Sequence, residues 1–297
     1  NEGKTAGVDM PGFDSVSLHM WHIYVGGLRQ LLDGSWVASD ITLARTLAEN
    51  SLDAFKWLDS IGVYAANGAD ASSGLFTVLG AMWPRTHRVS ASTELISILK
   101  DSAEKAGVTI YTETAATSLL TDENGKIVGA TAQKVNGTNI TINVTNGVVL
   151  ASGGYCANPT MVKEYDNYWG DSLSSHMLTT NVGTNKGDGI VMAEKIGADT
   201  IDMEYIQTYP VCDPETGALL YVGDVRLENH GILVNREGDR FVQELDRRDV
   251  ISNGIKNQTD GVAFLLFDQA AADETGLLKQ HADEYENSEA RGVIVKA

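Results

Sequence analysis

Arginine is concentrated near the end of this acidic sequence. Residues 235–249 read NREGDRFVQELDRRD, which puts four arginines within thirteen positions of a chain that has 22 basic and 40 acidic residues. Arg247 and Arg248 stand between Asp246 and Asp249. A guanidinium in such surroundings suits bidentate binding of a carboxylate or transfer of a proton. The same spacing also fits a surface ion-pair network on an exposed hairpin, so both interpretations stay open.

A second segment that could take part in ligand binding is VVLASGG, residues 148–154. An apolar strand that runs into Ser152 and Gly153 lets the backbone approach a ligand closely at the carboxyl edge of a sheet. The pattern equally describes a plain strand followed by a glycine turn.

A third segment is NKGDG, residues 185–189, directly before a predicted helix. Asp188 has the residue type of an ordinary N-cap. Its carboxylate could instead face a hydroxyl of a cofactor, since the flanking glycines leave room.

The composition excludes several classes of protein. The 297 residues are 43% hydrophobic and carry a formal charge of −18, which argues against a nucleic-acid partner because phosphate binding needs a clustered positive surface. Cys156 and Cys212 have no metal-ligand spacing, so we expect no metal site and two free thiols, with a single disulfide as the alternative. No run of eighteen apolar residues predicts a membrane span, and neither a GxGxxG motif nor a signal-peptide pattern occurs. We expect both ends to be those of an internal piece excised from a longer protein.

Helix signals surround these segments. Asp40 and Gly62 have the residue types of a helix start and a helix stop. Ser92 or Thr93 has the residue type of a second helix start, and Gly197 has that of the stop of a later helix. The sequence predicts helices over residues 41–61, 92–106, 158–165 and 189–196, and shorter helical pieces over 269–274 and 277–281.

Strand signals follow the second helix. Apolar runs and Asn-Gly turn pairs predict a meander, and Glu237-Gly238 predicts the turn of a hairpin. The predicted strands are residues 108–112, 118–120, 127–133, 140–144, 147–151, 232–235, 241–242 and 263–267.

The run GILVNREGDRFVQELDRRD, residues 231–249, resembles the stretch that carries the catalytic arginine in FAD-dependent fumarate and urocanate reductases. Four further motifs occur in that family's order: RTHR at 85–88, VVLASGGY at 148–155, GDGIVMAEKIGA at 187–198 and YIQTYP at 205–210. The resemblance implies an incomplete FAD-binding α/β domain with a β-meander over residues 1–203. Residues 204–297 would then be part of an α+β capping domain.

The resemblance also implies roles for individual residues. Arg248 matches the arginine that protonates the substrate after hydride arrives from FAD, and Arg247 is the fallback if the register slips by one. Asp224 and Asp249 match acidic positions near that arginine. The implied cofactor contacts are Ala116, Ala151, Ser152, Gly153 and Asp188.

Two positions depart from the fumarate reductase pattern. Tyr209 stands where those enzymes have a histidine that grips a fumarate carboxylate, and Asp224 stands where they have a glutamate. A phenol in place of a potential cation favours an aromatic or neutral group over a second carboxylate. We therefore expect a urocanate-like or other aryl-acrylate substrate, with fumarate next.

Other interpretations remain open. Ketosteroid dehydrogenases and aspartate oxidases share the cofactor domain, and a cofactor-free interaction module is a third possibility. Because GxGxxG is absent, we expect the full-length parent to be the enzyme and this piece alone to be inactive. The electron donor would be haem, FMN on another domain, or a partner protein. The compartment, bacterial cytoplasm or exported, is not predicted.

Overall fold

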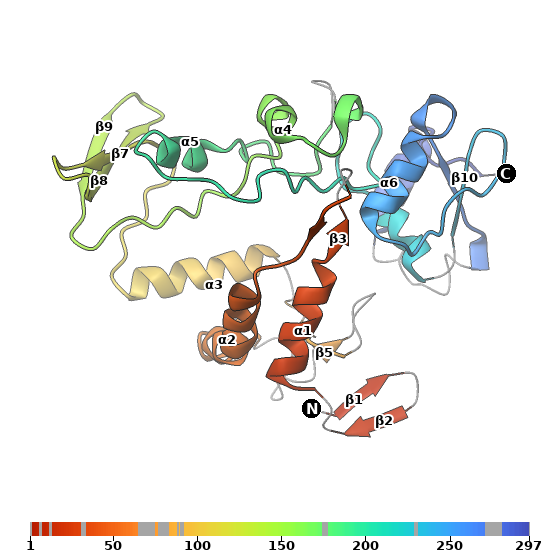
Figure 1. Ribbon diagram of the computed structural model, residues 1–297, viewed down its shortest axis with the longest axis horizontal. Helices are drawn as coiled ribbons and strands as arrows, with labels where there is room; N and C mark the ends of the chain where they lie inside the picture. Colours follow the sequence, from red (N-terminus) through yellow and green to blue (C-terminus); the bar gives the residue numbers. More distant parts are fainter. Residues whose placement is uncertain are drawn as a thin grey trace. The chain divides into compact units, whose positions relative to one another are not determined.

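The computed structural model describes residues 2–5, 8–11, 14–30, 34–64, 75–76, 83–87, 89, 92–173, 178–228, 231–270 and 281–296 (Figure 1). The chain divides into two compact units, residues 1–112 and residues 113–297. Both contain helices and strands, so the mixed α/β fold class predicted from the sequence is confirmed. No helix in the described ranges combines the length and hydropathy that a membrane span requires.

The first unit is built from helices and short strand pairs. Its helices are α1 (Val16–Gly26), α2 (Ile41–Ser60) and α3 (Ser92–Lys105). Asp40 accepts hydrogen bonds from the backbone N–H of Thr42 and Leu43, which confirms the predicted start of α2. The strand pairs are β1 (Glu2–Thr5) with β2 (Val8–Pro11), β3 (Arg29–Gln30) with β4 (Trp36–Val37), and β5 (Leu75–Phe76) with β6 (Thr86–His87).

The second unit begins with the predicted meander. Strands β7 (Thr114–Thr121), β8 (Ile127–Lys134) and β9 (Asn139–Asn143) form an antiparallel sheet in chain order. The turns occur at the predicted residues: Asp122 Oδ1 accepts the N–H groups of Asn124 and Lys126, and Gly137 has a φ of +84°. Helix α5 (Asp188–Glu194) packs against β7 (Figure 1).

The remaining elements of the described residues are short. They are α4 (Pro159–Tyr165), η3 (Gly170–Ser172), η4 (Tyr221–Glu228), β10 (Ile232–Val234), α6 (Arg248–Lys256), η5 (Thr259–Gly261), β11 (Phe264–Leu266) and α9 (Ala282–Ala290).

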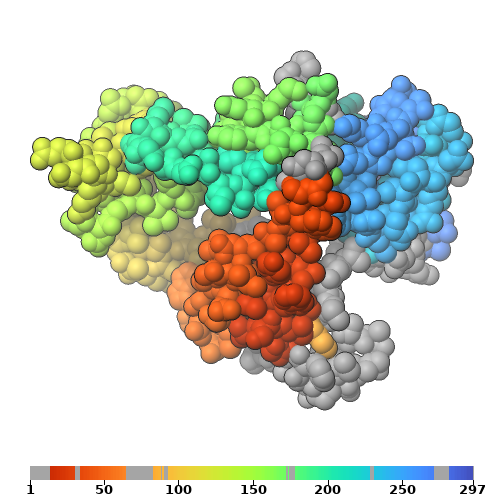
Figure 2. All heavy atoms as spheres, in the orientation of Figure 1, coloured from red at the N-terminus to blue at the C-terminus, as the bar shows by residue number. Residues whose placement is uncertain are grey.

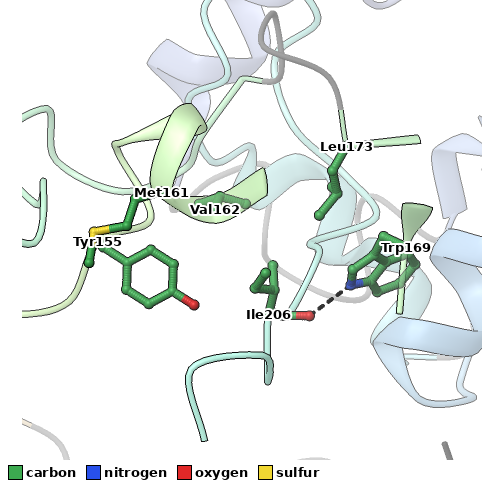
Figure 3. Close-up of a cluster of buried hydrophobic side chains, with 6 residues drawn as sticks. All are labelled: Tyr155, Met161, Val162, Trp169, Leu173 and Ile206. Atoms are coloured by element: carbon green, nitrogen blue, oxygen red, sulfur yellow. Dashed lines mark hydrogen bonds between the residues drawn. The ribbon is translucent and has the colours of Figure 1, made fainter. Parts of the chain in front are cut away.

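A buried hydrophobic cluster holds the middle of this unit. Trp169 and Ile206 belong to it, and the indole Nε1–H of Trp169 donates to the backbone oxygen of Ile206 at 2.9 Å (Figure 3). The other members are Tyr155, Met161, Val162 and Leu173. This cluster fixes the segment that leads to Gln207 and Tyr209.

Several sequence predictions were wrong. Residues 108–112, 147–151 and 241–242 form no strand, although they carry strand-like residues. Val149 is 90% exposed, and no described strand pairs with its segment, so the apolar run has no ladder to join. The predicted hairpin is confirmed at its turn, where Gly238 has a φ of +88° and Val234 meets Arg240 across an antiparallel bridge. Its second strand does not form, and β10 pairs with β11 instead. Most of the predicted helical pieces at 269–274 and 277–281 lies outside the described residues.

Candidate functional site

Helix α6 begins at the two adjacent arginines. Arg247 occupies the N-cap position and Arg248 is the first helical residue. Ile251, one turn further on, is fully buried and anchors the helix. The α6 segment, coloured blue, is visible at the surface in Figure 2, and both arginines are exposed. The buried Ile251 therefore holds the start of the helix while its arginines face solvent.

The two arginines have different partners. Arg247 forms a two-point ion pair with Asp249, at 3.2 Å from Nε and 2.9 Å from Nη2. Arg248 donates from Nη1 to the amide oxygen of Gln207 at 2.8 Å, and its guanidinium carbon lies 4.7 Å from the centre of the Tyr209 ring. No carboxylate oxygen of the described residues lies within 4.0 Å of the Arg248 nitrogens. The aspartate predicted beside the reactive arginine thus pairs with Arg247 instead.

Tyr209 connects Arg248 with the third predicted catalytic residue. Its hydroxyl donates to Asp224 Oδ1 at 2.7 Å. Burial, reinforced by the Asp224 carboxylate, raises the pKa of Tyr209 to about 12. The phenol is therefore neutral throughout the physiological range. Arg248, Tyr209 and Asp224 form one connected group, which we call the Arg248 cluster.

Asp224 of the Arg248 cluster lies on η4, a 3-10 helix that contacts α9. Val222 is buried, and its backbone N–H donates to the Glu284 carboxylate of α9 at 2.7 Å. Tyr221 stacks on His281, with ring centres 4.6 Å apart. The position of Asp224 therefore depends on the docking of α9.

Arg226 is a residue that sequence reasoning missed. It follows Asp224 by two positions, is 3% exposed, and donates from Nη1 to the backbone oxygen of Glu244 at 2.9 Å. Its buried Nε has no hydrogen-bond partner among the described residues. Its charge acts against the rise in the Tyr209 pKa. An arginine on the same short segment as Asp224 was the available signal.

Two of the five predicted cofactor contacts, Ser152 and Gly153, line a pocket of about 200 Å³ beside α5. Gly189 lines it as well, and a Cβ on Gly189 would lie 2.0 Å from the Ser152 hydroxyl oxygen, so a larger residue there would force that hydroxyl to turn away. The lining also includes Leu150, Ile190, Ala193, Glu194, Ala198, Asp199 and Thr200.

The other predicted cofactor residues lie outside this lining. Ala151 precedes Ser152 in the chain and is exposed. Ala116 is exposed on β7, the strand that α5 contacts, next to a register shift. The N-cap alternative for Asp188 is wrong, because Gly187 with a φ of +86° occupies that position and Asp188 is the first residue of the helix. A left-handed N-cap is a position that glycine adopts without strain.

Comparison with known proteins identifies the family of the chain. A family model described as an FAD binding domain matches residues 5–280. The chain belongs to the FAD-binding-domain family. This membership confirms the family resemblance inferred from the motifs and gives FAD as the cofactor of the family.

Curated relatives of this FAD-binding chain include reductases of unsaturated carboxylates. A urocanate reductase of Eggerthella lenta is 39% identical over 258 residues, which cover 86% of the chain and 41% of the relative. An NADH:acrylate oxidoreductase of Vibrio harveyi is 35% identical over 288 residues, 96% of the chain and 28% of the relative. The chain therefore spans less than half the length of these relatives.

Solved structures show the same fold. The open conformation of a flavocytochrome c3 fumarate reductase superposes with a TM-score of 0.72 at 29% identity, over 92% of this chain and 45% of that one. A 3-ketosteroid-delta4-(5alpha)-dehydrogenase from Rhodococcus jostii superposes with a TM-score of 0.58 at 25% identity, over 80% and 51%.

Proposed function

We propose that the full-length protein is a flavin-dependent reductase of an α,β-unsaturated carboxylate, with Arg248 as the proton donor. The observation that carries this proposal is the contrast between the two arginines. Arg247 is held by the Asp249 carboxylate, whereas the recorded contacts of Arg248 are a neutral amide and an aromatic ring. Four of the five N–H groups of Arg248 are thus left for a substrate, as far as the described residues go.

The reaction needs a hydride at one alkene carbon and a proton at the neighbouring carbon. FAD, when bound, supplies the hydride from N5. Arg248 binds the substrate through its charge and gives up a proton to the carbon next to the one that receives the hydride. Asp224 is the group that the family resemblance assigns to proton return. It reaches Arg248 only across the Tyr209 ring face, which carries no proton, so a water molecule would have to complete the path. These roles follow the family resemblance, and the proximity of Arg248, Tyr209 and Asp224 is consistent with them.

Tyr209 supports a urocanate-like substrate over fumarate. Its one hydroxyl hydrogen is donated to Asp224, so its oxygen faces other groups as an acceptor. An imidazole N–H suits that oxygen, whereas a carboxylate brings only acceptors and leaves both sides unsatisfied. The pKa of about 12 keeps the phenol neutral, so it offers no charge to a second carboxylate.

The pocket beside α5 suits an uncharged part of FAD. Its lining contains two carboxylates, Glu194 and Asp199, and no lysine or arginine. Carboxylates accept hydrogen bonds from hydroxyl and amino groups and repel phosphate. We infer that Ser152 and Gly153 lie against the adenosine end of the cofactor, with Ala116, Ala151 and Asp188 around it. The pyrophosphate would then lie on residues outside this lining.

We assign residues 1–203 to the FAD-binding domain and residues 204–297 to the substrate cap. The candidate cofactor contacts all precede residue 204, and Tyr209, Asp224 and Arg248 all follow it. The electron donor is then a separate domain or protein carrying haem or FMN, reached from the flavin.

Substitution of Arg248 in the full-length protein tests the proposal. We expect Arg248→Ala and Arg248→Lys to retain FAD and to lower enoate reduction by at least about a thousandfold, because the proton donor is lost. Turnover is measured with reduced viologen as the electron donor. Arg247→Ala tests the alternative register, and Arg236→Ala, which removes an exposed pair with Asp260, is the matched control. Retained turnover in both Arg248 variants would refute its role.

A substrate screen separates the second candidate function. The likeness to the ketosteroid dehydrogenase favours a dehydrogenase of enone steroids as the alternative. Urocanate, cinnamates, acrylate, fumarate and enone steroids are offered to the same enzyme. Turnover of the steroid alone would favour the dehydrogenase. A colourless full-length protein without flavin absorbance would instead support a cofactor-free module.

A further inference from the structure

We propose that Gln207 is a positioning residue that sets the direction of the Arg248 guanidinium; this inference rests on the proposed function of Arg248. The Gln207 amide oxygen accepts from Nη1 of Arg248 at 2.8 Å. The guanidinium then lies over the Tyr209 ring, two residues further along the chain, with its centre at 4.7 Å. One hydrogen bond and one ring contact fix the plane of the group, because each restricts a different rotation of the long side chain.

Both partners are anchored to the same core residue. The segment that carries Gln207 is fixed by Ile206, which is buried and whose carbonyl accepts from the indole of Trp169. Helix α6, which carries Arg248, is tied to the same place, since Lys256 donates to the backbone oxygen of Trp169 at 3.0 Å. Asn253 of α6 also donates to the Tyr168 hydroxyl at 3.1 Å. The Gln207–Arg248 contact therefore joins two segments that are each already fixed to Trp169.

The neutral charge of Gln207 matters as much as its geometry. A carboxylate in its place would form an ion pair with Arg248, and such charge-assisted bonds are roughly twice as strong as neutral ones. The neighbouring Arg247 shows this arrangement with Asp249. The amide instead orients Arg248 without neutralising it, so the positive charge remains available to an anionic substrate.

Two substitutions separate orientation from charge in the full-length enzyme. Gln207→Leu keeps the volume and removes the acceptor, and we expect kcat to fall about tenfold to a hundredfold with KM changed less than about threefold. Gln207→Glu keeps the oxygen and adds a negative charge. It should lower kcat at least as far and also raise KM for the carboxylate substrate about tenfold, because the added charge repels it.

Gln243→Leu is the matched control. Gln243 accepts from Nη2 of Arg240 at 3.0 Å, but Arg240 is held independently by Glu244, so kcat and KM should not change. Unchanged kcat in Gln207→Leu would overturn the proposal, since a space-filling role survives that substitution.

Crystal structures of the wild type and of Gln207→Leu separate the failure of this inference from failure of the proposed function. We expect the guanidinium to leave the Tyr209 ring in the variant. If it stays in place, the positioning role is wrong whatever the activity. If it moves while the wild type reduces no enoate, the positioning stands and the proposed reaction falls.

Discussion

Tyr209 donates its hydroxyl hydrogen to Asp224, and this bond decides what the phenol can offer a substrate. A hydrogen-bond donor at position 209 would favour fumarate over a urocanate-like substrate. Histidine is an imidazole that gains a proton near neutral pH, so beside the Asp224 carboxylate it would offer N–H donors and positive charge. Under the proposed function, selectivity at this end of the substrate would depend on one side chain and its one hydrogen bond.

Tyr209→His should move the substrate preference from urocanate toward fumarate. We expect the ratio of kcat/KM for the two substrates to change by about a hundredfold, the range that a matched or mismatched buried hydrogen-bonding group gives. Steady-state kinetics of the full-length enzyme with both substrates measure the ratio. Tyr221→Phe, on the exposed side of η4, serves as the control and should leave it unchanged. An unaltered ratio in Tyr209→His would remove Tyr209 from substrate selection.

Residue patterns predicted part of this arrangement. The motif order predicted Arg248, Tyr209 and Asp224, and the structure brings these three together. It did not predict Gln207 or Arg226, because their contacts join residues forty-one and eighteen positions apart, on Arg248 and Glu244. It also could not decide whether Asp249 faces Arg247 or Arg248, because that choice depends on where α6 begins.

Elements with local signals were predicted well. Helix caps, turn residues and the spacing of apolar residues all act within a few residues. These signals predicted the meander and the helices α2, α4 and α5. Helix α1 was missed because its residues, VSLHMWHIYVG, are mostly apolar all round and show no amphipathic stripe. Residues 147–151 were wrongly predicted as a strand, because strand pairing depends on a partner that local sequence does not reveal.

The docking of α9 shows how one element positions another. Arg291, just after this helix, binds Asp213 at 2.7 Å, and Glu284 within it binds the backbone of η4. Asp213 is 2% exposed and also accepts the N–H groups of Glu215 and Thr216. The bonds from Thr216 and Glu215, together with Arg291, lower the pKa of Asp213 to about 2.

Asp213→Asn should weaken this docking in a pH-dependent way. The pKa of Asp213 in the folded protein lies below the ordinary value of an aspartate, so its ionised carboxylate stabilises the fold above about pH 4, and this stabilisation is lost as the pH falls toward 2. We expect the variant to be less stable by about 1–3 kcal/mol at neutral pH, and the difference to shrink between pH 4 and pH 2. Urea unfolding over this range measures it.

Asp122→Asn is the control for that series. Asp122 also accepts two backbone N–H groups in a turn, but it makes no ion pair among the described residues. Its variant should therefore show a smaller loss of stability than Asp213→Asn at neutral pH. A constant difference for Asp213→Asn at every pH would mean that its charge does not hold α9.

At the scale of the whole molecule, we propose that the FAD site extends beyond the pocket beside α5. The pocket beside α5 has two carboxylates and no cation in its lining, which suits adenosine and not a pyrophosphate. The pyrophosphate of FAD is normally held at a helix N-terminus that follows a GxGxxG turn, and this motif is absent from the 297 residues. The relatives are more than twice as long as the matched region.

We therefore expect the 297-residue chain by itself to bind FAD at least about a hundredfold more weakly than the full-length protein, because the proposal places the phosphate contacts, which are charge-assisted bonds, outside this pocket and outside this sequence, which lacks GxGxxG. Adenosine, AMP and FAD should bind the isolated chain with affinities within about threefold of one another, because the pocket reads the nucleoside alone. Calorimetry with the three ligands, on the chain and on the full-length protein, measures both effects. A tenfold gain from adenosine to AMP on the isolated chain would reveal a phosphate contact that the lining does not contain. Full affinity for FAD would place the whole cofactor site within these residues.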